Sequence, residues 1–168
     1  MAKITFKGSE INSIGNLPDL NTKAPNFKLT AADLSTKTLE DFNGQNVLLN
    51  IFPSVDTGTC AASVRQFNTE ASELENTKVL CVSKDLPFAQ ARFCAAEGLE
   101  NVINLSDFKT NNFGNDYGTT LTDSPLEGLH SRAVVVIDKN GTVIYTEHVA
   151  EVTEEPNYKA ALEALVNL

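Results

Sequence analysis

Continuous apolar runs and regularly spaced apolar residues divide the chain into segments that predict strands and helices. Three runs, Asn46–Phe52 (NVLLNIF), Lys78–Ser83 (KVLCVS) and Ala133–Ile137 (AVVVI), are apolar almost throughout. Such runs are typical of strands that are covered on both faces of a sheet. The turn signal Asp138–Gly141 (DKNG) follows the third run, and Thr142–Thr146 (TVIYT) has the composition of a further strand. This pair predicts an antiparallel hairpin.

Helical spacing fills the intervals between these strands. A helix is predicted from about Cys60 to about Glu75, because apolar residues recur on one of its faces. These residues are Val64, Phe67, Ala71 and Leu74. A second helix is predicted over Pro87–Glu97, with Asp85 and the proline as start signals and Gly98 as the stop signal. Tyr158–Asn167 (YKAALEALVN) predicts a short closing helix.

The order of the elements predicts the fold class. Lys3–Phe6 and Glu10–Ile14 flank Gly8, which predicts a small N-terminal β-hairpin. Short strands are expected at Phe27–Leu29 and Val102–Leu105, the latter followed by irregular or helical structure. Alternating strands and helices require an α/β fold with a central mixed β-sheet flanked by helices. The closing β-β-α order is typical of a thioredoxin-like fold, and residues 1–168 are expected to form one such domain.

Composition excludes several classes of function. The chain has 168 residues, 42% hydrophobic and 21% charged, with a net charge of −9, which is typical of a globular protein without a basic surface for nucleic acid or anionic membranes. No stretch approaches the ~18 apolar residues of a membrane span, and the N-terminus lacks the apolar core of a secretory signal.

The number and spacing of the cysteines exclude two further classes of protein. Three cysteines at scattered positions form neither a secreted disulfide framework nor a zinc site. The sequence therefore predicts a cytoplasmic protein with a few special thiols and without a metal or cofactor.

The segment between the first apolar strand and the first helix carries the candidate chemistry. In α/β sheets, ligands bind beyond the carboxyl ends of strands. Cys60 lies there in the first turn of the predicted helix, where free N–H groups and the helix dipole favour a thiolate. Two alternatives stay open from position alone: Cys60 as a buried core residue, and Thr57 as a helix cap.

The residues around Cys60 also resemble a known family. Pro53, Thr57 and Cys60 form the pattern P-x-x-x-T-x-x-C, which resembles the motif of peroxiredoxins. Four segments are similar, in order, to the bacterial thiol peroxidase branch of that family, and the resemblance extends almost end to end. They are Ser54–Asn68 (SVDTGTCAASVRQFN), Asp85–Gln90 (DLPFAQ), Arg92–Cys94 (RFC) and Gly128–Ala133 (GLHSRA).

The resemblance implies a role for each of five residues. Cys60 would be the peroxidatic thiolate that attacks the terminal peroxide oxygen, and Thr57 would orient the peroxide. Pro53 would shield the thiolate from water, and Arg132 would stabilise the thiolate and the charge that develops on oxygen. Cys94 would be the resolving thiol.

The same resemblance implies the overall activity. The chain would reduce hydrogen peroxide and organic hydroperoxides, form an intrachain Cys60–Cys94 disulfide, be recycled by thioredoxin and act as a homodimer. A disulfide oxidoreductase is disfavoured because the chain has no C-x-x-C motif. A redox sensor that uses Cys60 as a switch stays open.

The remaining candidates have plainer interpretations. Arg132 by pattern alone suits a surface ion pair, and Cys94 suits a buried core position as well as a resolving one. Cys81 lies in the middle of a buried strand and is expected to be inert. His130 adjoins Arg132 and is expected in an exposed loop, with the lining of the pocket as the alternative. His148 is expected at the surface. Arg65 is expected on a solvated face or in an ion pair.

Overall fold

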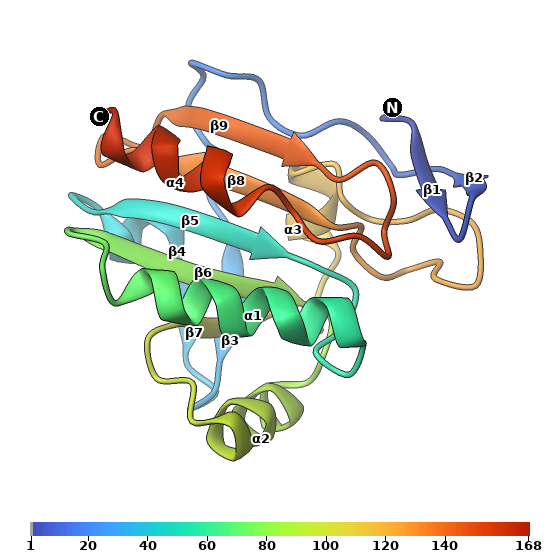
Figure 1. The fold of residues 1–168 in the computed structure, drawn as a ribbon, viewed down its shortest axis with the longest axis horizontal. Helices are drawn as coiled ribbons and strands as arrows, with labels where there is room; N and C mark the ends of the chain where they lie inside the picture. Colours follow the sequence, from blue (N-terminus) through green and yellow to red (C-terminus); the bar gives the residue numbers. More distant parts are fainter. Residues whose placement is uncertain (1) are drawn as a thin grey trace.

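Seven strands form one mixed sheet across the middle of the molecule (Figure 1). The computed structural model describes residues 2–168. The strands lie in the spatial order β4-β3-β7-β6-β5-β8-β9. They are β3 (Lys28–Ala31), β4 (Thr36–Thr38), β5 (Asn46–Ile51), β6 (Thr77–Ser83), β7 (Ile103–Ser106), β8 (Ala133–Ile137) and β9 (Val143–His148). Strands β5, β6 and β7 are parallel, and the other neighbours are antiparallel, which confirms the expected mixed sheet.

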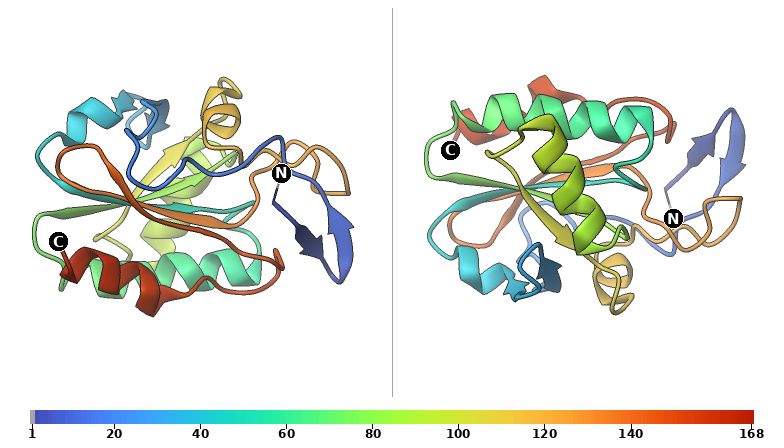
Figure 2. Two further views of the ribbon diagram at one scale, coloured as in Figure 1. Left: turned by 90° about the horizontal axis from the view of Figure 1, so that it is seen from above. Right: turned by 90° about the horizontal axis from the view of Figure 1, so that it is seen from below.

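Helices cover both faces of this sheet (Figure 2). The helical elements are α1 (Gly58–Ala71), α2 (Pro87–Glu97), α3 (Asn112–Asp116), α4 (Tyr158–Val166) and the 3-10 helix η1 (Leu39–Phe42). Apolar residues of α1, α2 and α4 share one core layer with the sheet, whereas residues of η1 and α3 belong to the layer on the opposite face. The central strands are therefore enclosed from both sides.

This enclosure explains the apolar runs in the sequence. All five residues of β8 are buried. Within β5, Leu48 packs into the layer of α1, and its neighbour Leu49 packs into the opposite layer. Each fully buried aliphatic side chain contributes about 1.5–3 kcal/mol relative to an exposed one. The runs thus provide the two-sided core that fixes the ends of the strands.

The N-terminal hairpin, β1 (Ile4–Phe6) paired with β2 (Ser9–Ile11), lies beside the sheet as a separate pair of strands (Figure 2). The backbone N–H of Thr5 donates to the carbonyl of Ala150 at 2.7 Å, and the N–H of Val152 donates to the carbonyl of Thr5 at 2.9 Å. The Glu151 carboxylate accepts from the N–H groups of the hairpin turn. The hairpin is thereby attached to the segment that follows β9.

Most predicted elements are confirmed, with differences at their ends. The second helix begins and ends as expected, and Gly98 adopts the left-handed conformation with φ 67° at its C-terminus. The first helix begins earlier than expected and ends at Ala71, so Leu74 packs on the core from beyond the helix. Strand β4 was not predicted, because its three residues, Thr36–Thr38, have no apolar signal.

Candidate active site

Cys60 lies in the first turn of α1, directly after the loop that leaves the carboxyl end of β5. Its side chain is fully buried. Thr57 occupies the N-cap position, but its side chain makes no capping hydrogen bond. The Thr57 hydroxyl instead donates to the carbonyl of Ser54 at 3.1 Å. Side-chain capping is therefore not what Thr57 does here.

Arg132 reaches Cys60 because the sheet register brings them together. Ile51 at the end of β5 pairs with Ala133 at the start of β8, so the residue before β8 lies beside the loop after β5. The Arg132 Nη2 donates to the Cys60 Sγ at 3.1 Å, and its Nε donates to the Val152 carbonyl at 2.9 Å. The surface ion pair considered for this arginine is wrong, because only 1% of the residue is exposed.

Arg132 is a buried cation, and the Cys60 sulfur is one of its hydrogen-bond acceptors. Among residues 2–168, no carboxylate lies within ion-pair distance of this guanidinium. Burying a cation without an anionic partner is costly, and the acceptors that the structure gives this guanidinium are the Cys60 sulfur and the Val152 carbonyl. The remaining nitrogen, Nη1, is buried and has no hydrogen-bond partner among the described residues. It is a donor available to an incoming group.

A cavity of about 310 Å³ opens at this point of the molecule. Its lining includes Pro53, Thr57 and Arg132, three of the residues singled out in the sequence. The apolar part of the lining comes from Phe6, Leu126 and Val152. No local pattern in the sequence indicated these three, because the N-terminal hairpin and two loops reach the cavity only through the tertiary fold.

Cys94 lies elsewhere. It is half-buried on α2, where the Asn104 side-chain amide donates to its sulfur at 2.6 Å. Cys94 and Asn104 line a second cavity, of about 340 Å³, which is distinct from that of Arg132. All three cysteines are free. The structure thus groups Pro53, Thr57 and Arg132 with Cys60 but leaves Cys94 apart.

Burial raises the pKa of two of the three thiols, Cys94 and Cys81. Burial raises the pKa of Cys94, against a lowering contribution from the Asn104 hydrogen bond. Burial in β6 raises the pKa of Cys81 to about 12, again opposed by a hydrogen bond, from Asn50. A thiol with such a pKa stays protonated at neutral pH and is a poor nucleophile. Cys81 is fully buried, as the sequence predicted.

The exposed position predicted for His130 is wrong, and His148 is only partly exposed. His130 is completely buried: its Nδ1 lies 3.0 Å from the Thr119 hydroxyl, and its Nε2 lies 3.2 Å from Asp107. His148 is partly buried, and its Nε2 lies 2.7 Å from the Ser131 hydroxyl. Burial lowers the pKa of His148 to about 4. Loop and strand-end positions in the sequence gave no signal of these long-range contacts.

Arg65 forms the ion pair that was one of its two expected roles. Its Nε lies 2.9 Å from the Glu97 carboxylate, and the contact joins α1 to α2. Both groups are substantially exposed, so solvent screens the pair and it contributes little to stability.

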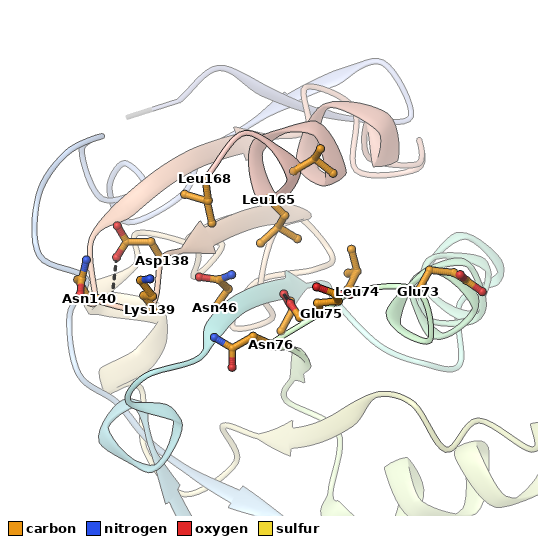
Figure 3. Close-up of a pocket in the computed structure, with 12 residues that line it drawn as sticks. Asn46, Glu73, Leu74, Glu75, Asn76, Asp138, Lys139, Asn140, Leu165 and Leu168 are labelled. Carbon is orange, nitrogen blue, oxygen red and sulfur yellow. Dashed lines mark hydrogen bonds between the residues drawn. The ribbon is translucent and has the colours of Figure 1, made fainter.

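A larger cavity, of about 750 Å³, lies at the opposite end of the sheet (Figure 3). Its lining includes Asn46, which begins β5, together with Asp138, Leu165 and Leu168. Cys60 follows the other end of β5, and no cysteine is among the residues that line this cavity.

The chain matches the Redoxin family over residues 19–162. It is also 56% identical over 165 residues to the thiol peroxidase of Mycobacterium tuberculosis, covering 98% of this chain and 99% of that protein. The chain belongs to the thiol peroxidase branch of the peroxiredoxins. The thiol peroxidase of Corynebacterium glutamicum is 53% identical, over the same shares of the two chains. The expectation of a peroxidase is therefore confirmed.

Solved structures agree with this family assignment. The peroxiredoxin-like protein of Aquifex aeolicus matches with a TM-score of 0.94 and 32% identity, over 99% of this chain and 97% of that one. The thiol peroxidase of Chromobacterium violaceum matches with a TM-score of 0.91 at 24% identity, again over 99% and 97%, which supports the fold alone. The thioredoxin-like fold is thereby confirmed. Among residues 2–168, no helix combines the length and apolarity needed to cross a membrane.

Proposed function

We propose that Cys60 is the peroxidatic thiolate of this peroxiredoxin. The observation that carries the proposal is the buried Arg132 guanidinium, whose Nη2 donates to the Cys60 sulfur at 3.1 Å. The thiolate attacks the terminal oxygen of a hydroperoxide. The S–O bond forms as the O–O bond breaks, and the leaving oxygen takes a proton to give water or an alcohol. Cys60 becomes a sulfenic acid.

Arg132, Thr57 and Pro53 prepare the cavity for this step. Charge moves from sulfur toward the leaving oxygen, so donors fixed along that path stabilise the transition state more than the ground state. The free Nη1 of Arg132 and the Thr57 hydroxyl are suited to hold the peroxide oxygens. Pro53 lines the same cavity and shields the thiolate from water. Since the other walls are largely apolar, organic hydroperoxides are substrates alongside hydrogen peroxide.

Cys94 then resolves the sulfenic acid. Its thiol attacks the Cys60 sulfur, a disulfide forms, and the hydroxyl leaves as water. A disulfide requires Cα atoms within about 7 Å. Cys60 is fully buried in the first turn of α1, whereas Cys94 lines a separate cavity from α2, so we expect a conformational change before the two sulfurs can bond. We expect the first turn of α1 and the helix α2 to loosen for this step.

Thioredoxin is the reductant that we propose for the disulfide, and the chain works in the cytoplasm as a homodimer of single-domain subunits. These assignments follow from the resemblance to the family and from the high identity to bacterial thiol peroxidases. The electron balance requires such a partner, because each peroxide reduced consumes two thiols that a dithiol must restore.

Peroxide consumption with a thioredoxin system tests the proposal most simply. Folded Cys60→Ser protein should lose turnover completely, because the hydroxyl cannot replace the thiolate. Cys81→Ala is the matched control and should retain turnover, since Cys81 lies buried in β6. Substantial turnover by Cys60→Ser would refute the assignment. A single oxidation of wild-type protein without recycling would favour the redox sensor.

A further inference from the structure

Asp85 connects the loop before Cys60 to the corner between β6 and α2. One carboxylate oxygen accepts from the Ser54 hydroxyl at 2.7 Å. The other accepts from the N–H of Val55 at 2.9 Å and from the Ser83 hydroxyl at 2.6 Å. Among residues 2–168, no cationic side chain lies within ion-pair distance of this carboxylate. Its charge is therefore stabilised by hydrogen bonds from two separate segments.

On the side of Cys60, the connection reaches Thr57. Ser54 donates its hydroxyl to Asp85, while its carbonyl accepts from both the hydroxyl and the N–H of Thr57, at 3.1 and 3.2 Å. Asp85 thus fixes the residue on which the Thr57 hydroxyl depends.

On the side of Cys94, the connection enters α2. The Ser83 hydroxyl also accepts from the Gln90 side-chain amide at 3.0 Å, and the same amide donates to the Leu105 carbonyl at 3.1 Å. Gln90 is fully buried and lies four residues before Cys94, on the same face of the helix. Asp85 is therefore joined to both helices that carry the proposed redox thiols.

We propose that Asp85 is a positioning residue that couples the opening of the Cys60 loop to the release of α2. This inference rests on the proposed function, in which both segments loosen before the Cys60–Cys94 disulfide forms. The latch, meaning Asp85 with Ser54, Val55 and Ser83, keeps both segments closed while peroxide reacts. The stability of the latch then sets the rate at which both segments open, and so the lifetime of the sulfenic acid before Cys94 reacts with it.

The lifetime of the sulfenic acid determines which of two products Cys60 forms. Fast opening lets the Cys94 thiol form the disulfide with loss of water. Slow opening lets a second hydroperoxide transfer oxygen to the sulfenic acid, which gives a sulfinic acid and another alcohol or water. A weaker latch should therefore protect Cys60 from over-oxidation, at the cost of a less ordered Thr57 in the first step.

Hydrogen exchange of reduced Asp85→Asn protein tests the latch without any turnover. Exchange over residues 54–64 and 87–97 should accelerate together, by about tenfold, because the amide keeps one neutral acceptor oxygen and its NH2 group cannot accept from these donors. Asp123→Asn is the matched control: Asp123 likewise accepts a backbone N–H and a side-chain amide, both from Asn12, and should leave both segments unchanged. Acceleration in only one segment, or in neither, would overturn the coupling.

A second variant keeps the test decisive if Asp85→Asn folds poorly. Ser54→Ala removes one hydrogen bond and leaves the carboxylate in place, so it should accelerate the same two segments to a smaller extent. In peroxide titrations, both variants should require more peroxide than wild type to produce sulfinic Cys60. Wild-type protein that forms no Cys60–Cys94 disulfide would refute the proposed function, and the exchange result would still decide whether Asp85 couples the segments.

Discussion

Cys60 and Cys94 are both cysteines of helices that pack on the same core layer, but their sulfurs have different partners. A buried cation, Arg132, donates to Cys60 at 3.1 Å, whereas a neutral amide, that of Asn104, donates to Cys94 at 2.6 Å. A cation stabilises a thiolate, and a neutral amide on a half-buried thiol does so less. The comparison teaches that two cysteines on one core layer can differ in the charge of the group that donates to their sulfurs, which supports the separate roles proposed for them.

Removing Cys94, the proposed resolving thiol, should have the largest effect of the changes considered, which is a loss of recycling. Cys94→Ser should consume about one equivalent of peroxide and then stall or over-oxidise when thioredoxin is the only reductant, because the other thiol that remains, Cys81, is buried in β6. Peroxide consumption followed over time measures this. Sustained turnover by Cys94→Ser would show that the two cysteines are not partners.

Replacing the hydrogen-bond donor of each sulfur in turn should separate the oxidation of Cys60 from the later reaction of Cys94. Arg132→Met should slow oxidation of Cys60 by about a hundredfold, the usual cost of losing one preorganised donor. Asn104→Leu should leave that step unchanged, because the Asn104 side chain donates to the Cys94 sulfur and lines the cavity on that side. Rapid mixing with peroxide resolves the first step. A trace of Arg132→Met that matches wild type would reduce the arginine to a structural role.

Selective alkylation should rank the thiols by environment. At mildly acidic pH, Cys60 should react before Cys81, because a cation stabilises its thiolate while burial raises the pKa of Cys81 to about 12. Mass spectrometry of the labelled peptides measures the order. Labelling of Cys81 ahead of Cys60 would contradict the description of both environments.

The smallest expected effect is on stability in acid. The pKa of His148 falls from 6.5 to about 4 in the folded chain, so the unfolded state binds the proton first. Stability present above pH 6.5 is therefore lost as the pH falls toward 4. The loss approaches about 1.4 kcal/mol per pH unit for each such group.

His148→Gln keeps a polar partner for Ser131 and should flatten part of this slope. Denaturant unfolding between pH 6.5 and 5 measures it, a range above that in which most carboxylates titrate. His130, whose pKa is also lowered by burial against the opposing effect of Asp107, contributes in the same direction and remains in the variant. Identical slopes in wild type and variant would show that His148 does not titrate as described.

Local signals predicted those elements whose causes are local. Pro87 and Gly98 bound α2 because proline suits the first turn of a helix and glycine adopts the left-handed conformation at its end. Strand β4 has no such signal, since its Thr-Lys-Thr residues depend on pairing with β3.

From the residues alone, the sequence predicted only those parts of the site that belong to a local motif. Pro53, Thr57 and Cys60 are close in sequence, and Arg132 joins them through the Ile51–Ala133 register, which no local pattern reveals. Asp85 was expected to mark the start of α2, but Leu86 is the N-cap, and the Asp85 carboxylate binds the Cys60 loop instead. Contacts between segments that are distant in the sequence explain why neither the position of Arg132 nor the contacts of Asp85 were predicted.

Peptide mapping after a single equivalent of peroxide is the most direct test of the central claim that Cys60 is oxidised and Cys94 resolves it. Wild-type protein, oxidised and digested without reduction, should yield one disulfide, between the peptides that contain Cys60 and Cys94. Cys94→Ser should instead carry the oxidation on Cys60. A disulfide that contains Cys81, or an unmodified Cys60 after peroxide has been consumed, would contradict the account.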